Sequence, residues 1–191
     1  MEKEGEYQHK SIKHLMLTSF FNILEDEIKY VAEESNSTFI YKRWTERDYK
    51  SLNTRQLDFL KVLDLSFLNL NKIPQEIGCL ENLEELNLAG NSLKELPEEI
   101  YNLKNLKVLI LGDVISGGNN LTSLSRNIEK LTNLEVLKIV WNKDLKELPK
   151  EILKLPKLDL VFLSQQSILN NDVGQKLLMK CYVDIEDLYN D

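Results

Sequence analysis

The chain has 191 residues, enough for one compact domain, and its 42% hydrophobic and 29% charged residues exclude an intrinsically disordered protein. Its 31 acidic residues outnumber its 24 basic ones, and this net charge of −7 argues against a nucleic-acid partner, because phosphate binding needs clustered positive charge. No run approaches about 18 consecutive apolar residues, so we expect no transmembrane helix and no membrane partner.

The amino terminus and the cysteine content predict a cytoplasmic protein. The sequence begins Met-Glu-Lys-Glu-Gly-Glu, which is acidic and is followed by no apolar signal-peptide core. Cys79 and Cys181 are the only two cysteines, too few for a disulfide framework, and they favour a reducing compartment. A secreted effector is the alternative location.

Residues 11–33 are predicted to form a helix within an amino-terminal cap that covers residues 1–59. Apolar residues recur at helical spacing on one stripe, while the acidic residues lie mostly off it. The stripe contains Ile12, Leu15, Met16, Ser19, Phe20, Ile23, Leu24, Ile28 and Val31. Such a helix would cover the apolar end of the domain that follows.

A short strand is expected next, at about residues 38–43 within the β-forming segment 37–44. Ile40 precedes Leu63 by 23 residues, so this strand could be a degenerate first copy of the repeat described below. Lys42 would then occupy a core leucine position, which counts against that register. Thr45 and Asp48 could cap a short helix that extends to about Leu57.

The segment 60–168 is internally repetitive. Windows 60–82 and 83–105 have 23 residues each, and window 106–133 has five more, around Gly117 and Gly118. Window 134–157 has one extra residue near Lys143, and a fifth, broken copy starts at Leu158. About eight apolar positions recur in register across four copies, so the repeat dominates the fold.

Each copy combines two periodicities. In the second copy Leu86 and Leu88 alternate with polar residues, which is the strand period, whereas Leu96, Ile100 and Leu103 have helical spacing. Each unit is therefore a strand followed by a helical or 3₁₀ return segment, and neighbouring units must stack to bury their leucines. Parallel strands are expected near 61–65, 84–88, 107–111, 135–139 and 159–163.

This pattern resembles the leucine-rich repeat family, in the subtype with the second half L-P-x-x-I-x-x-L. The resemblance implies an α/β fold, a right-handed horseshoe solenoid of four to five repeats with a parallel concave sheet. It also implies that asparagines at the strand-to-loop bend satisfy backbone groups, at Asn91 and Asn142. Leu68 and Gln166 replace this asparagine in the first and last copies, and Ser125 replaces the proline that begins the other return segments.

Residues 169–191 are predicted to form a carboxy-terminal cap and an acidic tail. A short helix over 173–182 would close the core through Val173, Leu177, Leu178 and Cys181. The final residues, DIEDLYND, are expected to be frayed.

Outward-facing strand positions contain the candidate binding site. Folding needs no large apolar side chain there, yet the carboxy-terminal copies have several, and such patches tend to be interaction sites. We expect Trp141 to be the anchor, with Lys138 and Asp113 as a charged border. The predicted partner-binding residues are Ile110, Asp113, Lys138, Val140, Trp141 and Phe162. One alternative remains open: the tail 169–191 covers this patch, and the binding site then lies at the Phe39–Phe67 end or at the loop around Gly117 and Gly118.

No motif points to catalysis, a cofactor or a metal. The only histidines, His9 and His14, have no nucleophile or orienting acid nearby in sequence, and neither C-x-x-C nor H-x-x-x-H spacing occurs. The loop 112–120 lacks the lysine that a phosphate-binding loop needs after its last glycine. We therefore predict a monomeric, non-enzymatic scaffold that binds a protein partner; the alternative is a substrate-recognition domain or subunit of a larger enzyme, such as a bacterial effector or a ubiquitin ligase.

Overall fold

The computed structural model describes residues 19–28, 30, 56, 59–164 and 166–185. Six parallel strands form one open sheet in which spatial order follows sequence order. The five predicted strands are confirmed, and the sixth was not predicted. The strands are β1 (Val62–Asp64), β2 (Glu85–Asn87), β3 (Val108–Gly112), β4 (Val136–Ile139), β5 (Leu160–Leu163) and β6 (Tyr182–Ile185).

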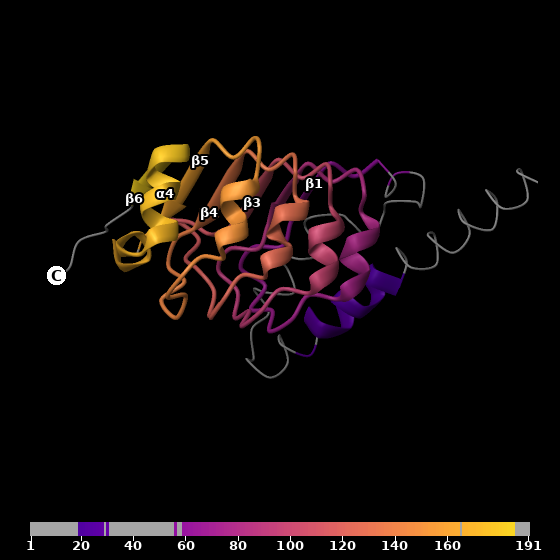
Figure 1. Ribbon diagram of the computed structural model, residues 1–191. Helices are drawn as coiled ribbons and strands as arrows, with labels where there is room; N and C mark the ends of the chain where they lie inside the picture. Colours follow the sequence, from indigo (N-terminus) through magenta and orange to yellow (C-terminus); the bar gives the residue numbers. More distant parts are fainter. Residues whose placement is uncertain (1–18, 29, 31–55, 57–58, 165, 186–191) are drawn as a thin grey trace, which may run out of the picture.

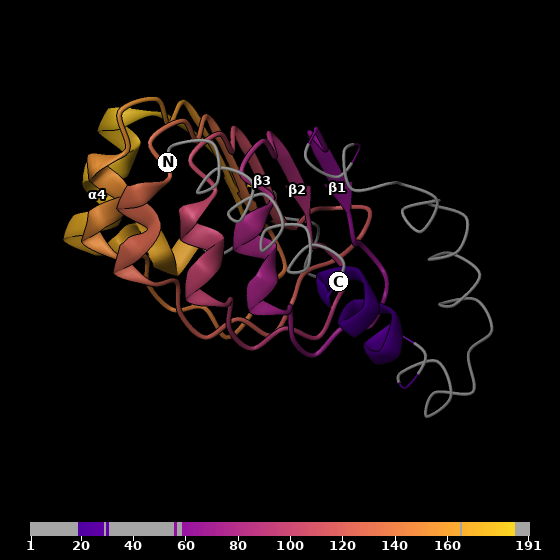
Figure 2. The same ribbon diagram turned by 90° about the vertical axis from the view of Figure 1, so that its right-hand side faces the viewer.

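Return segments form a second layer on one side of the sheet (Figures 1 and 2). Four of them begin after a residue with extended backbone, which is proline in three copies. In the third copy Ser125 takes this place, and its side chain accepts a hydrogen bond from the N–H of Asn127. The 3₁₀ helices are η2 (Gln75–Cys79), η3 (Glu98–Asn102), η4 (Arg126–Lys130), η5 (Lys150–Lys154) and η6 (Gln166–Asn170).

The core lies between these two layers and is built from repeat-equivalent leucines. Strand pairing places Leu63, Leu86, Leu109 and Leu137 side by side, and all four are fully buried. Burying a side chain of this kind contributes about 1.5–3 kcal/mol, and a single repeat could not bury it alone. The predicted leucine-rich-repeat solenoid is therefore the observed architecture.

Buried asparagines complete the turns that follow the strands. The side-chain oxygen of Asn91 accepts hydrogen bonds from the N–H groups of Leu68 and Leu70, at 3.1 and 3.0 Å. Its amide nitrogen donates to the carbonyls of Leu65 and Leu88, both at 2.9 Å. One side chain thus joins two repeats by satisfying backbone groups that would otherwise be buried without partners.

The amino-terminal helix is described over residues 19–28, within the predicted 11–33. Phe20, Phe21, Leu24 and Ile28 are buried in the same core as the repeats. Glu27 also forms an ion pair with Lys72, at 2.8 Å. The rest of the predicted helix, the strand at 38–43 and nearly all of the helix expected up to Leu57 lie outside the described residues.

At the other end, the helix α4 (Asp172–Lys180) leads directly into β6, which pairs with β5 (Figure 1). Leu177 is buried, and Val173 and Cys181 pack against the core, but Leu178 is exposed and does not help to close it. The expectation of a frayed end is wrong for residues 184 and 185, because both belong to β6. Among the described residues, no helix is long and apolar enough to cross a membrane.

Candidate protein-binding face

Two rows of outward-facing residues cross the sheet on the side opposite α4. Strand pairing aligns them because equivalent positions of neighbouring strands are in register. The first row is Val62, Glu85, Val108, Val136, Leu160 and Tyr182. The second row is Asp64, Asn87, Ile110, Lys138, Phe162 and Asp184. We call the part of these rows on β3 to β6 the carboxy-terminal face.

The carboxy-terminal face is predominantly apolar. Ile110 and Phe162, both predicted as binding residues, are partly exposed there, as is Leu160. Tyr182 adds an aromatic side chain that is 66% exposed. Sequence reasoning missed this residue because β6 lacks the repeat motif. The described part of the tail therefore extends the face as a further strand and does not lie across it.

Trp141 lies at the edge of this face where the chain turns after β4. Its backbone has a φ of 60°, and its N–H donates to the hydroxyl of Ser164 at 2.9 Å. The equivalent positions of the first two repeats, Phe67 and Gly90, have φ values of 58° and 66°. Glycine adopts this left-handed conformation without the steric cost that other residues have, so an aromatic residue there is strained.

Val140 was predicted to face outward, and this prediction is wrong: its side chain is completely buried. β4 ends at Ile139, so the strand alternation does not continue to the next residue. The equivalent residues Ser66 and Ala89 are buried as well. Their small size in two other repeats was the signal that this position faces inward.

The loop after β3 is tightly folded. Asp113 and Gly117 form an antiparallel bridge, and the carboxylate of Asp113 accepts hydrogen bonds from the N–H groups of Ile115 and Ser116, at 2.8 and 2.6 Å. A Cβ on Gly112 or Gly118 would clash with the backbone of residues 140–141. The loop therefore packs directly against the turn that holds Trp141, and Asp113 is engaged in shaping the loop.

The loop also ends in a buried asparagine, Asn119, which joins neighbouring repeats by hydrogen bonds. Asn119 donates to the carbonyls of Leu88 and Leu111, at 2.9 and 2.7 Å, and accepts from the N–H of Leu93. It takes in the third repeat the role of Asn91 in the second. The sequence did not reveal this role because the insertion shifts Asn119 from its usual position.

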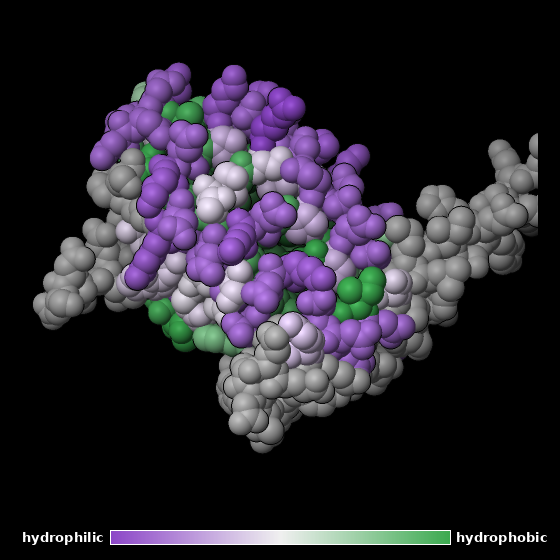
Figure 3. Space-filling model, turned by 90° about the horizontal axis from the view of Figure 1, so that it is seen from below, coloured by the Kyte–Doolittle hydropathy of each residue, from purple (hydrophilic) through white to green (hydrophobic). Residues whose placement is uncertain are grey.

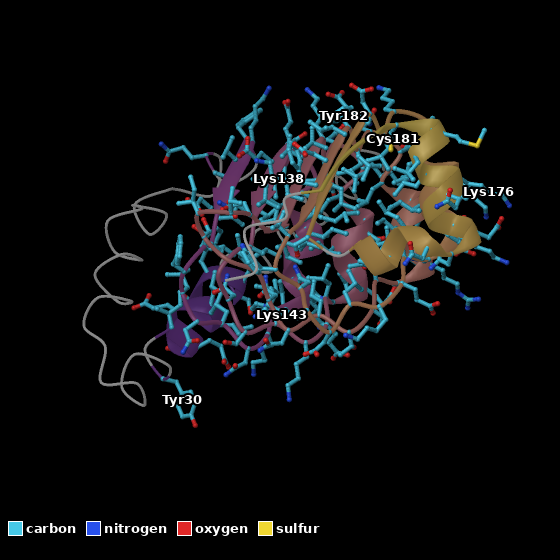
Figure 4. The ribbon with its side chains drawn as sticks, turned by 90° about the vertical axis from the view of Figure 1, so that its left-hand side faces the viewer. Tyr30, Lys138, Lys143, Lys176, Cys181 and Tyr182 are labelled. Atoms are coloured by element: carbon cyan, nitrogen blue, oxygen red, sulfur yellow. The ribbon has the colours of Figure 1, made fainter. Side chains whose placement is uncertain are left out.

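Two lysines contact aromatic rings near the face. The ammonium of Lys138 lies 4.8 Å from the ring centroid of Phe162, and that of Lys143 lies 5.7 Å from the ring of Trp141. Figure 4 shows Lys138 on the sheet side, away from α4, with Lys143 at the edge where the strands end. Seen from that edge, hydrophilic residues cover most of the surface and hydrophobic ones form separate patches (Figure 3).

The opposite edge of the sheet has a ladder of charges. Glu84 pairs with Lys61, at 2.7 Å, and with Lys107. The hydrogen bonds from Lys107 and Lys61 lower the pKa of Glu84 from 4.5 to about 2. These residues, with Phe59, line an open depression of about 390 Å³ that sequence reasoning did not predict.

Potential metal ligands are scattered over the described residues. These residues contain no group of three or more His, Cys, Asp or Glu side chains that could hold a metal ion. Burial raises the pKa of the Cys181 thiol above its ordinary value. A raised pKa keeps that thiol protonated and therefore poorly nucleophilic. His9 and His14 lie outside the described residues.

Comparison with known protein families agrees with this architecture. A family model described as a leucine-rich repeat region matches residues 44–178. The chain belongs to the leucine-rich repeat family. Domains of this family are typically non-enzymatic interaction modules, so the fold fits a protein-interaction scaffold. A search of curated proteins gives no significant match.

Solved leucine-rich repeat structures resemble the chain in part. An LRR protein of Leptospira interrogans is 30% identical, with a TM-score of 0.42, over 70% of this chain and 40% of that protein. The plant peptide hormone receptor RGFR1, solved in complex with RGF2, is 32% identical, with a TM-score of 0.42, over 66% of this chain and 24% of the receptor. An internalin of Listeria monocytogenes is 16% identical, with a TM-score of 0.39, over 85% of this chain and 61% of that protein. The chain thus spans 40% of the first protein and 24% of the second, which is less than half of either.

Proposed function

We propose that this leucine-rich repeat protein is a non-enzymatic scaffold that binds a protein partner through its carboxy-terminal face. The contact residues are Ile110, Lys138, Trp141 and Phe162, together with Tyr182, and Asp113 orders the adjoining loop. The observation that carries the proposal is the row alignment of Ile110 and Phe162 on outward positions that the core does not need. Large apolar groups left in water contribute nothing to folding and favour association.

The backbone at Trp141 supports the same assignment. Gly90 satisfies the equivalent turn without strain, whereas Trp141 adopts a φ of 60° at a cost of about 1–2 kcal/mol. A strained position that retains a large aromatic side chain is a candidate for function. Tryptophan also provides a rigid contact area at little cost in conformational entropy, which suits an anchor residue.

The test is partner capture by the full chain in three forms: wild type, a Trp141→Ala, Phe162→Ala variant, and a Leu178→Ala, Met179→Ala variant. The last is a matched control, because Leu178 and Met179 are exposed apolar residues on α4, away from the sheet face. We expect the first variant to lose the partner and the control to keep it, with Trp141→Ala alone weakening binding by about 2 kcal/mol or more. Equal capture by wild type and both variants would refute this assignment.

A further inference from the structure

The side chain of Lys138 has surroundings unlike those of the ion-paired lysines. It projects from the middle of β4, with Ile110 and Phe162 as its row neighbours on either side. Val136, two residues earlier on the same strand, faces the same way. The residue is partly buried, and its ammonium lies 4.8 Å from the ring centroid of Phe162. It is thus a cation surrounded by apolar side chains.

No carboxylate within the described part of the chain lies at ion-pair distance from Lys138. The lysines that do form ion pairs lie at the sheet edge or on the return segments and α4, as Lys107, Lys154 and Lys176 show. Lys138 is therefore held by a cation–π contact and has no ion-pair partner among the described carboxylates, which leaves its ammonium available to an external group. A cation–π contact of this kind is worth about 0.5–1 kcal/mol at an exposed site, enough to favour one orientation of the side chain.

A partner that covers this face must compensate the positive charge of Lys138. Burying an unpaired ammonium costs several kcal/mol, whereas a carboxylate placed against it restores the lost hydration energy in part and fixes the register of binding. Resting on the proposed function above, we propose that the partner presents an acidic side chain to Lys138, flanked by apolar residues that contact Ile110 and Phe162.

The same row fixes a second feature of the partner. Asp184 on β6 is the register partner of Phe162, so it lies two strands from Lys138, at a separation of roughly 10 Å. The row thus presents a cation and an anion on either side of one aromatic ring. A complementary segment has a basic residue for Asp184, which in an extended chain lies about three residues from the acidic one.

The experiment selects peptides from a random display library on the full chain. Peptides whose binding is lost with Phe162→Ala are taken as ligands of the carboxy-terminal face. We expect these ligands to be enriched in Asp or Glu beside apolar residues, and their affinity to fall about tenfold or more on Lys138→Glu. Selection on Lys138→Glu should enrich Lys or Arg at the same peptide position. Lys94→Glu makes the same charge change on the exposed loop between β2 and η3 and should leave affinity unchanged.

A second variant, Lys138→Met, tests the inference independently of Lys138→Glu. Lys138→Met keeps the apolar stem and removes the charge, so it should weaken acidic peptides and favour neutral apolar ones. Face ligands without an acidic preference, or with unchanged affinity for both Lys138 variants, would overturn this inference and leave the proposed function intact. If no selected peptide is sensitive to Phe162→Ala, the inference and the proposed function both fail.

Discussion

The inner and outer sides of the strands differ in how strongly the stacking of repeats constrains their residues. On the inner side, Leu86, Leu109 and Leu137 are identical and fully buried, because each must pack on its equivalent in the next repeat. On the outer side, the neighbouring residues Asn87, Ile110 and Lys138 differ in every repeat. Stacking therefore constrains one side only, and the other side is free to vary with the demands of recognition.

The largest expected effect comes from adjacent residues of β3 that face opposite ways. Leu109→Ala should destabilise the protein by about 2–5 kcal/mol because it opens a cavity in the core. Ile110→Ala, its matched control on the outer side, should cost about 1 kcal/mol or less. Urea denaturation of both variants measures the difference. Equal losses would contradict the assignment of the two sides.

A buried asparagine and an exposed one should differ in their contribution to stability. Asn91→Ala removes the acceptor for the N–H groups of Leu68 and Leu70, both of which are buried, so we expect a loss of about 3 kcal/mol. Asn105 is exposed and donates one hydrogen bond, to the carbonyl of Glu81, and Asn105→Ala should cost about 0.5 kcal/mol or less. A small loss for Asn91→Ala in thermal or urea unfolding would mean that water replaces the side chain.

Two glycines of the inserted loop allow a test of whether direct contact or loop conformation holds the Trp141 turn. Gly112→Ala forces a Cβ against the carbonyl of Val140, and we expect it to cost about 2 kcal/mol. Gly117→Ala meets no atom within 4 Å but must adopt a φ of 76°, so about 1 kcal/mol is expected. Hydrogen exchange should show loosening at the Trp141 turn in the first variant alone. Loosening of that turn in both variants would show that loop conformation, and not direct contact, holds it.

The smallest effect concerns the charged sheet edge. Glu84 has its pKa lowered from 4.5 to about 2 in the folded protein, so its ion pairs stabilise the fold above pH 4.5 and are lost as the pH falls towards 2. The stability difference between wild type and Glu84→Gln should therefore shrink over that interval. Two unfolding-free-energy profiles that stay parallel with pH would exclude a linked contribution from this carboxylate.

Most of the fold could be predicted from sequence because the inner leucines recur in register. The same strand period predicted Ile110, Lys138 and Phe162 as outward residues, as their partial exposure between buried neighbours confirms. It failed at Val140 because the strand ends one residue earlier, so the alternation of inward and outward residues no longer applies there. Only comparison with Ser66 and Ala89 could have corrected this error.

Other features left no comparable pattern in the sequence. β6 is four residues long, follows a helix and lacks the repeat motif, so nothing distinguished it from a tail. Asn119 was missed because an insertion displaced it. The exposure of Leu178 depends on how α4 lies against the last repeat, which helical spacing alone does not determine.

The inserted loop has a consequence for redesign. Five additional residues enter the third repeat, yet the pairing of β3 with β4 changes only by a register shift between Ile110 and Gly112. Asn119 bonds to the carbonyls of Leu88 and Leu111, and each repeat contacts mainly its neighbours, so we expect a different sequence grafted between Asp113 and Gly117 to leave the rest of the stack folded. This segment is thus a suitable position for a foreign recognition sequence. Gly112 and Gly118 should be kept, because a Cβ at either position would clash with the backbone of residues 140–141.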